Sequence, residues 1–592
     1  MPTTPETITR VFDILDYAQA KYPTDQFCNY KRGDSWISFA TKDVNTLSDK
    51  LAAGLIASGV QAGDLVSIIG YNCPEWNIVD FGIQKAGAVS IPCYHNLSEV
   101  DYVFILSQAQ PKLIFCGSLD VYQNIDGLIN QLPYQPRLVC LQQQGAIPYW
   151  GDLVDQATTD ALEVVMANKA SIQPDQLCTI LYTSGTTGSP NGVMLSHANI
   201  VANVQDCAEH FPVSPGDRFL SFLPISHALE RTVLYIIMFG GVQIWYAEGI
   251  DTVAASLKEV KPHLFTTVPR MLEKVYDRII QRGYDQKGIK RLLFFWALHL
   301  AQQYRPGKAR TVWYDFQLRI ARKLVFSKWQ EALGGNLRVV VSGGAALQDR
   351  LGSVFWGAGI PIMEGYGMTE ASPVISVNHL LEANNRVATL GLPLRRCLVK
   401  LSDEGELMVK GPNVFMGYFQ NPELTARVLD AEGWLSTGDI VEWVEDRFLK
   451  IKDRKKDLFK TSGGMYIPPT QLELMLKESM VVEQAIVVGE NQKFPAALLT
   501  VSWENLRSWA GIHGLVWTTD IEMLNHPEVK QKYEREVASQ NEKLTAYKQI
   551  KKFVILPDTW SVESGELTVT MKVKRRVVIQ QYAAHIAAMY AE

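Results

Sequence analysis

The sequence predicts an α/β protein with a large N-terminal domain and a small C-terminal domain, and three observations support this. First, 592 residues with 47% hydrophobic and 20% charged side chains are globular in composition but too many for one ordinary hydrophobic core. Second, from about residue 35, segments with helical spacing alternate with short apolar segments. Third, a dense charge run at 452–457 precedes a final stretch with its own pattern, as expected of an exposed domain boundary.

The N-terminal part shows the clearest alternation. Apolar residues at helical spacing run from Val44 to Leu55, and Gly59 is a plausible stop. Three apolar segments then read as buried strands: 65–69, 88–91 and 113–115. Strands that alternate with helices form parallel sheets covered on both faces, and such sheets bind ligands beyond the carboxyl ends of their strands. We therefore expect the chemistry in strand-to-helix turns of a domain that spans residues 1–453.

The remaining residues, 454–592, read as a separate small unit. An amphipathic segment at 471–476 and a polar helix around 530–543 accompany two predicted strands, 485–488 and 497–501. This mixture predicts a compact unit of helices and strands.

Composition and charge exclude several functional classes. The net charge is −5, from 57 basic and 62 acidic side chains, so bulk electrostatics give no reason to expect a nucleic-acid partner. The eight cysteines are scattered without a CxxC pair, which suits a reducing compartment and argues against a disulfide framework or a zinc site. The longest charge-free apolar segment, 232–247, is too short for an ordinary spanning helix and reads as a buried helix that runs into a strand. With no signal-peptide pattern at the N-terminus, we expect a cytoplasmic protein.

Residues from about 282 to 330 differ in composition from the rest of the chain, and we predict that they form a helical insertion. Basic and aromatic residues interleave there with few acids: Lys287, Lys290, Arg291, Arg305, Lys308, Arg310, Arg319, Arg322, Lys323 and Lys328 with Phe294, Phe295, Trp296, Trp313 and Trp329. One interpretation is a helical surface that rests on an anionic membrane. The other is that the rings pack inward and the charges are solvated, since basic helix faces are common.

A segment rich in glycine and hydroxyl groups follows the predicted strand 177–182. It consists of Thr183, Ser184, Gly185, Thr186, Thr187 and Gly188. Hydroxyls and glycines at this density supply side-chain donors and backbone N–H groups that can wrap a polyphosphate. No Gly-Lys-Ser/Thr closes the segment, so it is not the P-loop of common NTPases; a flexible surface loop is the alternative interpretation.

Further segments with candidate site residues follow in order along the chain. They are 223–231 with His227, Glu230 and Arg231; 342–346 with Gly343, Gly344 and Ala345; 364–370 with Tyr366, Gly367, Thr369 and Glu370; 434–439 with Asp439; 453–457 with Arg454 and Lys456; and 565–576 with Lys572. Like the segment Thr183–Gly188, the segments 342–346 and 364–370 follow predicted strands, and all three are expected to be strand-to-helix turns. Taken singly, each has a structural interpretation, such as a tight turn or a solvated charge cluster.

Taken together, these segments resemble the ordered motifs of the superfamily that joins acyl-CoA synthetases, peptide-synthetase adenylation domains and firefly luciferase. Segments 72–76 and 87–92 are also similar to this family, so the resemblance covers nearly the whole chain. The Glu230–Arg231 pair and the helical insertion resemble the long-chain fatty acyl-CoA synthetase branch. The resemblance implies an α/β fold with stacked sheets and flanking helices in the large domain and a small, mobile α+β C-terminal domain.

The resemblance assigns the ATP-binding residues. The loop Thr183–Gly188 would hold the triphosphate, and Gly343, Gly344 and Ala345 would offer bare backbone to the adenine ring. Tyr366, followed by Gly367, would stack on adenine. Asp439 and Arg454 would contact the two ribose hydroxyls.

The resemblance also assigns the catalytic residues. Glu370 would offer an oxygen ligand to Mg²⁺, and Thr369 would reach the α-phosphate. His227 would border the acyl pocket near the reacting carboxylate. Lys572 would stabilise the charge that accumulates on the α-phosphate, and Lys456 would be the hinge about which the small domain turns.

The implied reaction is ATP- and Mg²⁺-dependent activation of a long-chain fatty acid to an acyl-adenylate, followed by transfer to CoA with release of AMP. Two alternatives stay open. The acceptor could be the thiol of an acyl carrier protein; fatty acyl-AMP ligases typically carry an extra insertion after the hinge, which is not seen at 460–464. The chain could instead be a non-catalytic nucleotide or fatty-acid binding module, because Asn191 replaces a usual lysine and Val569 replaces a common proline.

Overall fold

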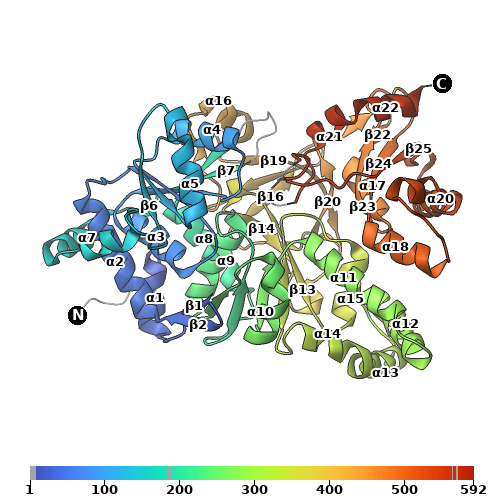
Figure 1. The fold of residues 1–592 in the computed structure, drawn as a ribbon, viewed down its shortest axis with the longest axis horizontal. Helices are drawn as coiled ribbons and strands as arrows, with labels where there is room; N and C mark the ends of the chain where they lie inside the picture. The colour runs from blue at the N-terminus through green and yellow to red at the C-terminus, as the bar shows by residue number, and fades with distance from the viewer. Residues whose placement is uncertain (1–7, 184–189, 563, 569–570, 592) are drawn as a thin grey trace.

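The computed structural model describes residues 8–183, 190–562, 564–568 and 571–591, and these form two large sheets and three smaller ones (Figure 1). The first large sheet contains β3 (Leu65–Ile69), β4 (Val89–Cys93), β5 (Leu113–Cys116), β6 (Arg137–Cys140), β7 (Leu177–Thr183), β8 (Asn191–Ser196) and β18 (Gly417–Tyr418). Its strand order is β18-β8-β7-β4-β3-β5-β6, and the run from β7 to β6 is parallel.

The second large sheet has nine strands in the order β15-β14-β13-β12-β11-β9-β10-β1-β2. Their bounds are β1 (Cys28–Arg32), β2 (Ser35–Phe39), β9 (Arg218–Ser221), β10 (Gln243–Tyr246), β11 (Leu264–Thr267), β12 (Val339–Ser342), β13 (Ile362–Gly367), β14 (Val374–Val377) and β15 (Leu392–Pro393). The strands from β13 to β1 are parallel, as the alternation of strands and helices predicts.

Three smaller sheets complete the strands among the described residues. They are β16 (Leu398–Leu401), β17 (Glu406–Lys410), β19 (Leu435–Val444) and β20 (Phe448–Arg454); β21 (Phe459–Lys460) and β22 (Tyr466–Ile467); and β23 (Val482–Val488), β24 (Ala496–Val501) and β25 (Lys552–Leu556).

Helices flank and separate the sheets. Their bounds are α1 (Asp13–Lys21), α2 (Thr41–Ala57), α3 (Pro74–Lys85), α4 (Glu99–Ala109), α5 (Leu119–Leu128), α6 (Trp150–Asp155), α7 (Thr159–Ser171), α8 (His197–Ala208), α9 (Ala228–Phe239), α10 (Val253–Val260), α11 (Pro269–Tyr284), α12 (Ile289–Gln302), α13 (Val312–Ala321), α14 (Ser327–Ala332), α15 (Asp349–Gly357), α16 (Pro422–Val428), α17 (Pro469–Leu476), α18 (Trp503–Ile512), α19 (Asp520–Asn525), α20 (Pro527–Asn541), α21 (Arg575–Gln581) and α22 (Ala583–Tyr590). None of the described helices has the length and apolar character needed to cross a bilayer.

Helix α9 lies between the two large sheets and fixes the position of the residue before it, His227. Arg231 faces the first sheet: its guanidinium donates to hydroxyls on β4 and β7 and pairs with Asp80 of α3 at 2.5 Å. Glu230 faces the second sheet, where hydroxyls on β9 and β11 donate to its carboxylate. Both side chains are buried. Glu230 and Arg231, two adjacent residues of opposite charge, therefore hold α9 against both large sheets. This arrangement agrees with the stacked sheets expected from the family resemblance.

The predicted elements are confirmed, but two predicted turns are wrong. The segment after β7 connects it to the antiparallel strand β8, with Thr183 opposite Asn191, so this turn is a hairpin rather than a strand-to-helix turn. The segment 364–370 lies largely in β13, whose last residues pair with the antiparallel β14. A Cβ on Gly367 would lie 1.8 Å from the Pro373 carbonyl oxygen, so this pairing requires glycine. Only 342–346 leads to a helix, α15, as predicted.

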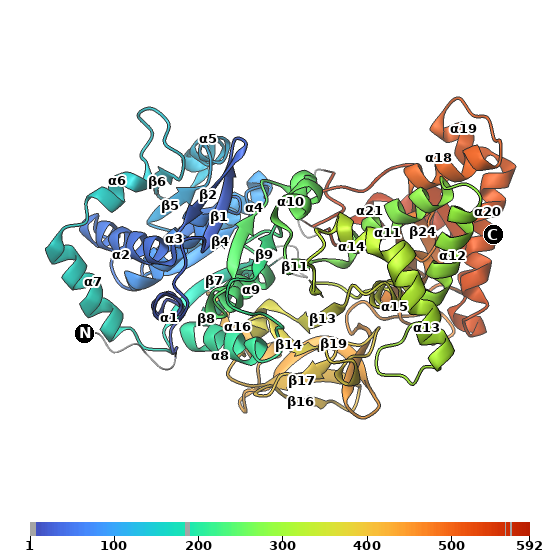
Figure 2. The same ribbon diagram turned by 90° about the horizontal axis from the view of Figure 1, so that it is seen from below.

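The C-terminal part is an α+β unit at one end of the molecule, beside helices α11 and α12 (Figure 2). Its predicted strands and helices correspond to β23, β24, α17 and α20. The insertion contains α12, α13, a five-residue π-helical turn at Arg322–Phe326, and α14. Phe294 and Trp329 pack inward, whereas Trp313 is 66% exposed. The inward-packing interpretation is therefore correct for part of the insertion and wrong for α13.

Candidate active site

The predicted phosphate loop lies at the C-terminal end of β7. Thr183 closes that strand opposite Asn191, at the edge of the sheet where parallel strands β3 and β4 also end. Ser184, Gly185, Thr186, Thr187 and Gly188 lie outside the described residues. Their role in holding a triphosphate therefore stays a prediction, supported by the position of the two strands that carry them.

The turn after β12 exposes backbone, as an adenine platform requires. The Gly343 amide donates to the Thr267 carbonyl at 3.2 Å, which fixes the start of the turn. Gly344 has φ +81°, and a Cβ there would have Val268 at 3.9 Å as its nearest contact. Gly344 and Ala345 are both exposed. The turn can thus present a bare, open backbone surface to a flat ring.

A carboxylate, a phenol and a guanidinium meet beside this turn. Asp439 of β19 lies opposite Arg454 of β20 in the antiparallel register, with Arg454 Nε 3.1 Å from Asp439 Oδ1. The Tyr366 hydroxyl donates to Asp439 Oδ2 at 2.6 Å. The Oδ1 atom is buried and, apart from this ion-pair contact with Arg454, accepts no hydrogen bond from a described residue. A buried carboxylate oxygen of this kind is suited to accept a ribose hydroxyl.

Glu370 is held by a residue that no sequence motif indicates. Glu370 and Thr369 lie in a 3₁₀ turn, and the Glu370 side chain is 9% exposed. The hydroxyl of Tyr418, from β18 of the other large sheet, donates to Glu370 Oε1 at 2.7 Å. The second oxygen makes no hydrogen bond with a described residue, so it fits the role of a single oxygen ligand to Mg²⁺.

His227 is a neutral hydrogen-bond donor in this arrangement. Its Nδ1 accepts the Leu229 backbone N–H at 3.1 Å and so caps α9. Burial, assisted by the Lys572 charge, lowers the His227 pKa to about 4, so the ring is neutral near pH 7. Because Nδ1 is the acceptor, the ring proton is on Nε2. His227 can therefore donate to a carboxylate oxygen but is not available as a base through Nδ1.

Lys572 comes from the C-terminal unit and meets residues of the larger one. The Lys572 side chain is exposed at the surface, but the surrounding protein partly desolvates its ammonium. This desolvation and then the Arg454 charge lower the pKa of Lys572 to about 8, with Asp439 opposing and Lys456 adding to the shift. The shift that Lys572 causes in His227 shows that their charges interact. The ammonium is therefore close enough to His227, Asp439 and Arg454 for their charges to interact. Lys456 itself lies in the turn directly after β20, where the chain leaves the larger unit.

Two residues beside His227 had no predicted role. Asn72 follows β3; its Oδ1 accepts the Ile225 N–H at 3.0 Å and its Nδ2 donates to the Leu223 carbonyl at 2.6 Å. It thereby shapes the loop that ends at His227. The Tyr94 ring follows β4 and lies 6.4 Å from the His227 ring, centroid to centroid. Both follow the carboxyl ends of parallel strands, and Asn72 also lies in the family-like segment 72–76; these are the signals in the sequence that could have indicated them.

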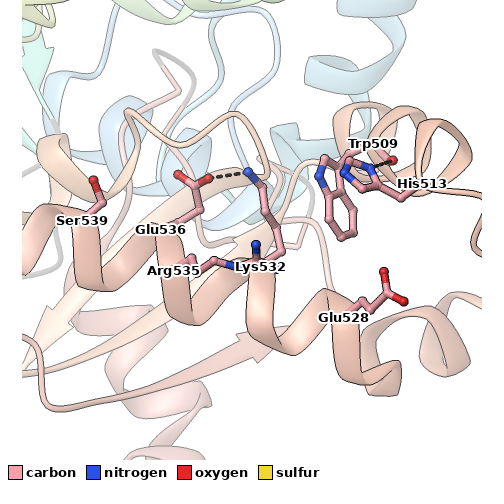
Figure 3. A pocket seen from close by; sticks show the side chains of 7 residues that line it. All are labelled: Trp509, His513, Glu528, Lys532, Arg535, Glu536 and Ser539. Carbon is pink, nitrogen blue, oxygen red and sulfur yellow. Dashed lines mark hydrogen bonds and ion pairs between the residues drawn. The ribbon is translucent and has the colours of Figure 1, made fainter.

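A separate concavity of about 400 Å³ lies on the C-terminal unit between α18 and α20 (Figure 3). Trp509 and His513 form one wall, and α20 forms the other with residues of both charges. Lys532 pairs with Glu536 at 2.5 Å, so charges on that wall are largely compensated. None of the candidate site residues predicted from the sequence lines it, so the candidate site is the region around Lys572, His227 and Asp439.

Comparisons with known proteins agree with this arrangement. Residues 15–419 match the AMP-binding enzyme family, and residues 456–592 match the AMP-binding enzyme C-terminal domain. The long-chain-fatty-acid–CoA ligase FadD15 of Mycobacterium bovis is 33% identical over 91% of this chain and 90% of its own length. Human long-chain-fatty-acid–CoA ligase 1 is 31% identical over 94% of this chain and 82% of its own.

Solved structures support the same fold. The adenylation domain of a Mycobacterium chelonae carboxylate reductase superposes with a TM-score of 0.76 at 21% identity, covering 100% of this chain and 92% of that one. An anthranilate CoA ligase in complex with anthranoyl-AMP gives a TM-score of 0.74 at 18% identity, covering 99% and 100%.

Proposed function

Because the chain belongs to the AMP-binding enzyme family, we propose that it is an AMP-forming long-chain fatty acid–CoA ligase. It would activate a fatty acid with ATP to an acyl-adenylate and transfer the acyl group to CoA, releasing pyrophosphate and AMP. One observation carries this proposal: the charge of Lys572, from the C-terminal unit, interacts with His227 and with the Asp439–Arg454 pair of the larger unit.

In the first half-reaction the fatty acid carboxylate attacks the α-phosphate. The neutral His227 donates from Nε2 to the carboxylate and orients it without taking up a proton. The Lys572 ammonium lies where negative charge grows on the α-phosphate, and Thr369 is proposed to reach the same group. Asp439, Arg454 and Tyr366 hold the ribose and adenine end. Positioning and charge stabilisation therefore account for the catalysis that this chain supplies.

Mg²⁺ fits the free Glu370 oxygen described above, and when bound it would neutralise charge on the triphosphate. Tyr418 fixes the carboxylate from the opposite sheet. The residues of the phosphate loop would then bind the β- and γ-phosphates.

In the second half-reaction the C-terminal domain, proposed as 454–592, turns about Lys456. This rotation withdraws Lys572 and opens the adenylate to the thiol of CoA. The turn that holds Lys456 is exposed, so the backbone can change there without loss of core packing.

The acyl chain and the acceptor are tested in one assay. We expect pyrophosphate release that depends on fatty acid, with maximal rates for long chains in a series from acetate to oleate, and thioester formation with CoA. Relatives named long-chain-fatty-acid–CoA ligases support this expectation. A maximum at acetate would refute the chain-length proposal. Thioester formation on an acyl carrier protein but not on CoA would reassign the acceptor, and no pyrophosphate release would indicate a binding module.

The pH dependence of adenylation is predicted from Lys572. Its pKa of about 8 means that the charged form is lost as pH rises through 8. We therefore expect kcat/KM for acyl-adenylate formation to fall above pH 8, because only the ammonium stabilises the transition state. Lys572→Arg keeps its charge at alkaline pH and should remove this fall, even if its rate is lower. An alkaline fall at an unchanged midpoint in Lys572→Arg would contradict the assignment.

We also propose that α13 makes peripheral contact with anionic lipid. One face of this helix and the turn after it is apolar and exposed: Val312 at 88%, Trp313 at 66%, Phe316 at 48%, Ile320 at 36% and Leu324 at 51%. Exposed cations beside it form no ion pair with any described residue: Arg319, Lys323 and Lys328. An apolar stripe bordered by free cations is complementary to an anionic bilayer surface.

Vesicle binding tests this contact. Val312→Glu combined with Trp313→Glu should weaken binding to phosphatidylglycerol vesicles at least about tenfold, since full burial of one such side chain contributes about 1.5–3 kcal/mol. Val516→Glu is a matched control, because Val516 is 87% exposed on the C-terminal unit. Salt should weaken binding of the unaltered protein. Absence of binding at low salt would refute the proposal.

A further inference from the structure

The loop between β9 and α9 carries His227 and is held by side chain and backbone together. Asn72, in the turn after β3, bridges the loop: its Oδ1 accepts the Ile225 N–H at 3.0 Å, and its Nδ2 donates to the Leu223 carbonyl at 2.6 Å. The His227 N–H donates to the Pro224 carbonyl at 3.0 Å. Three hydrogen bonds therefore fix the backbone that leads to the His227 ring.

The hydroxyl of Ser221, the last residue of β9, connects Asn72 with Glu230. Asn72 Nδ2 donates to the Ser221 hydroxyl oxygen at 3.1 Å. The same hydroxyl donates its own proton to Glu230 Oε1 at 2.6 Å. Ser221 and Glu230 are both 0% exposed. A buried chain of hydrogen bonds thus runs from the residue that bridges the His227 loop, through Ser221, to Glu230.

Thr266 of β11 continues this chain on the other side of Glu230. Its hydroxyl donates to Glu230 Oε2, the oxygen that Ser221 does not use. Leu220 pairs with Phe265 in the parallel register of β9 and β11, so Ser221 and Thr266 are the next neighbours along the two strands. One carboxylate therefore bridges the ends of two adjacent parallel strands.

The chain of hydrogen bonds ends one residue from the anchor of the adenine turn. Thr267 follows Thr266 directly, and its carbonyl accepts the Gly343 N–H at 3.2 Å. Strand β12 leads into the turn and pairs with β11 up to Thr267. Glu230 thus connects the loop that carries His227 with the strand that holds the adenine turn.

Three donors converge on the buried Glu230 carboxylate. Besides the Ser221 and Thr266 hydroxyls, the Phe222 N–H interacts with it. Burial raises the pKa of Glu230 to about 7, and these three donors oppose the rise. Because an unmatched donor or carboxylate oxygen is costly inside a protein, this geometry resists small displacements of either strand.

We propose that Glu230, with Ser221 and Thr266, is a positioning residue that sets the separation between His227 and the adenine turn. In the proposed reaction His227 orients the fatty acid carboxylate and the turn holds the adenine of ATP, so this separation aligns the attacking oxygen with the α-phosphate. Misplacement by about 1 Å can slow a reaction about 100-fold. The inference rests on the proposed function and adds to it buried residues that act through His227 and the turn.

A ligand that spans both subsites tests the proposal without catalysis. Oleoyl-sulfamoyladenosine mimics the acyl-adenylate, whereas AMP and oleate each fill one subsite. Ser221→Ala should weaken binding of the mimic about tenfold, because its two halves no longer fit both subsites at once, and should leave the Kd values of AMP and oleate within about twofold. Isothermal titration calorimetry measures all three. Unchanged binding of the mimic, or equal weakening of all three ligands, would overturn the proposal.

A second variant and a matched control complete this series. Thr266→Val keeps the side-chain volume and removes the hydroxyl, so it should reproduce the Ser221→Ala pattern; normal binding of the mimic would contradict the proposal. Ser90→Ala is the control, since Ser90 is also 0% exposed but its hydroxyl accepts from Arg231 on the side of α9 that faces the first sheet. Arg231 keeps its ion pair with Asp80, so all three Kd values should stay normal. Equal loss in Ser90→Ala would assign the effect to general packing of α9 and overturn the proposal.

Kinetics give a second readout of the same variants. In Ser221→Ala we expect kcat for fatty-acid-dependent pyrophosphate release to fall about tenfold, while the KM values for ATP and oleate change less than about twofold. A rise in either KM without a fall in kcat would contradict the positioning role. If the unaltered protein releases no pyrophosphate and binds none of the three ligands, the proposed function itself fails, which is a distinguishable result.

Discussion

Replacing Lys572 by alanine is expected to lower the rate of acyl-adenylate formation by about 10²–10³-fold, the range found when one preorganised charge-stabilising donor is removed. The ammonium interacts with His227 and Asp439, and we propose that charge grows on the α-phosphate beside it during attack. Transfer of supplied acyl-adenylate to CoA should stay near the unaltered rate, because the proposed domain rotation withdraws Lys572 from that step. Pyrophosphate release without CoA and thioester formation from oleoyl-adenylate measure the two rates separately.

The matched control is Arg576→Ala. Arg576 lies in the same basic segment and is exposed, and it pairs with no described residue. Both rates should be unchanged in this variant. If Lys572→Ala lowered both half-reactions equally, its effect would be one of folding or general binding, and the two-orientation mechanism would be wrong.

Replacing Lys456 by proline should have the opposite effect. The Lys456 amide donates no hydrogen bond to a described residue, so proline removes no contact that stabilises the present orientation. Proline fixes φ near −65°, however, and thereby restricts the rotation that the second half-reaction requires. We expect thioester formation to fall about 100-fold, corresponding to about 3 kcal/mol for reaching the second orientation, while adenylate formation stays near normal.

Lys456→Ala separates the backbone from the side chain in this experiment. It removes the ammonium but keeps the backbone free, so thioester formation should fall far less than in Lys456→Pro. Equal effects of alanine and proline would assign the loss to the missing charge. Normal thioester formation in Lys456→Pro would exclude Lys456 as the hinge.

Asn191 illustrates why both the sequence and the structure are needed to describe the candidate site. The sequence shows that the usual lysine of the phosphate loop is absent there. The structure places Asn191 at the start of β8, where it pairs with Thr183 at the end of β7. The loop is thus carried by an ordered pair of strands, and positive charge gathers where Arg454, Lys456 and Lys572 interact.

The sequence by itself determined the α/β class, the buried strands, the separate C-terminal unit and the order of the motifs, because apolar periodicity and glycine content are local properties of the chain. Only the tertiary structure decided that β7 continues into a hairpin and that β13 extends through Gly367, since the strand that pairs with each segment lies elsewhere in the sequence. The tertiary structure also places Tyr418 beside Glu370, Arg231 beside Asp80, and Lys572 near His227. These contacts depend on how layers and domains pack, and no local pattern of residues encodes that packing.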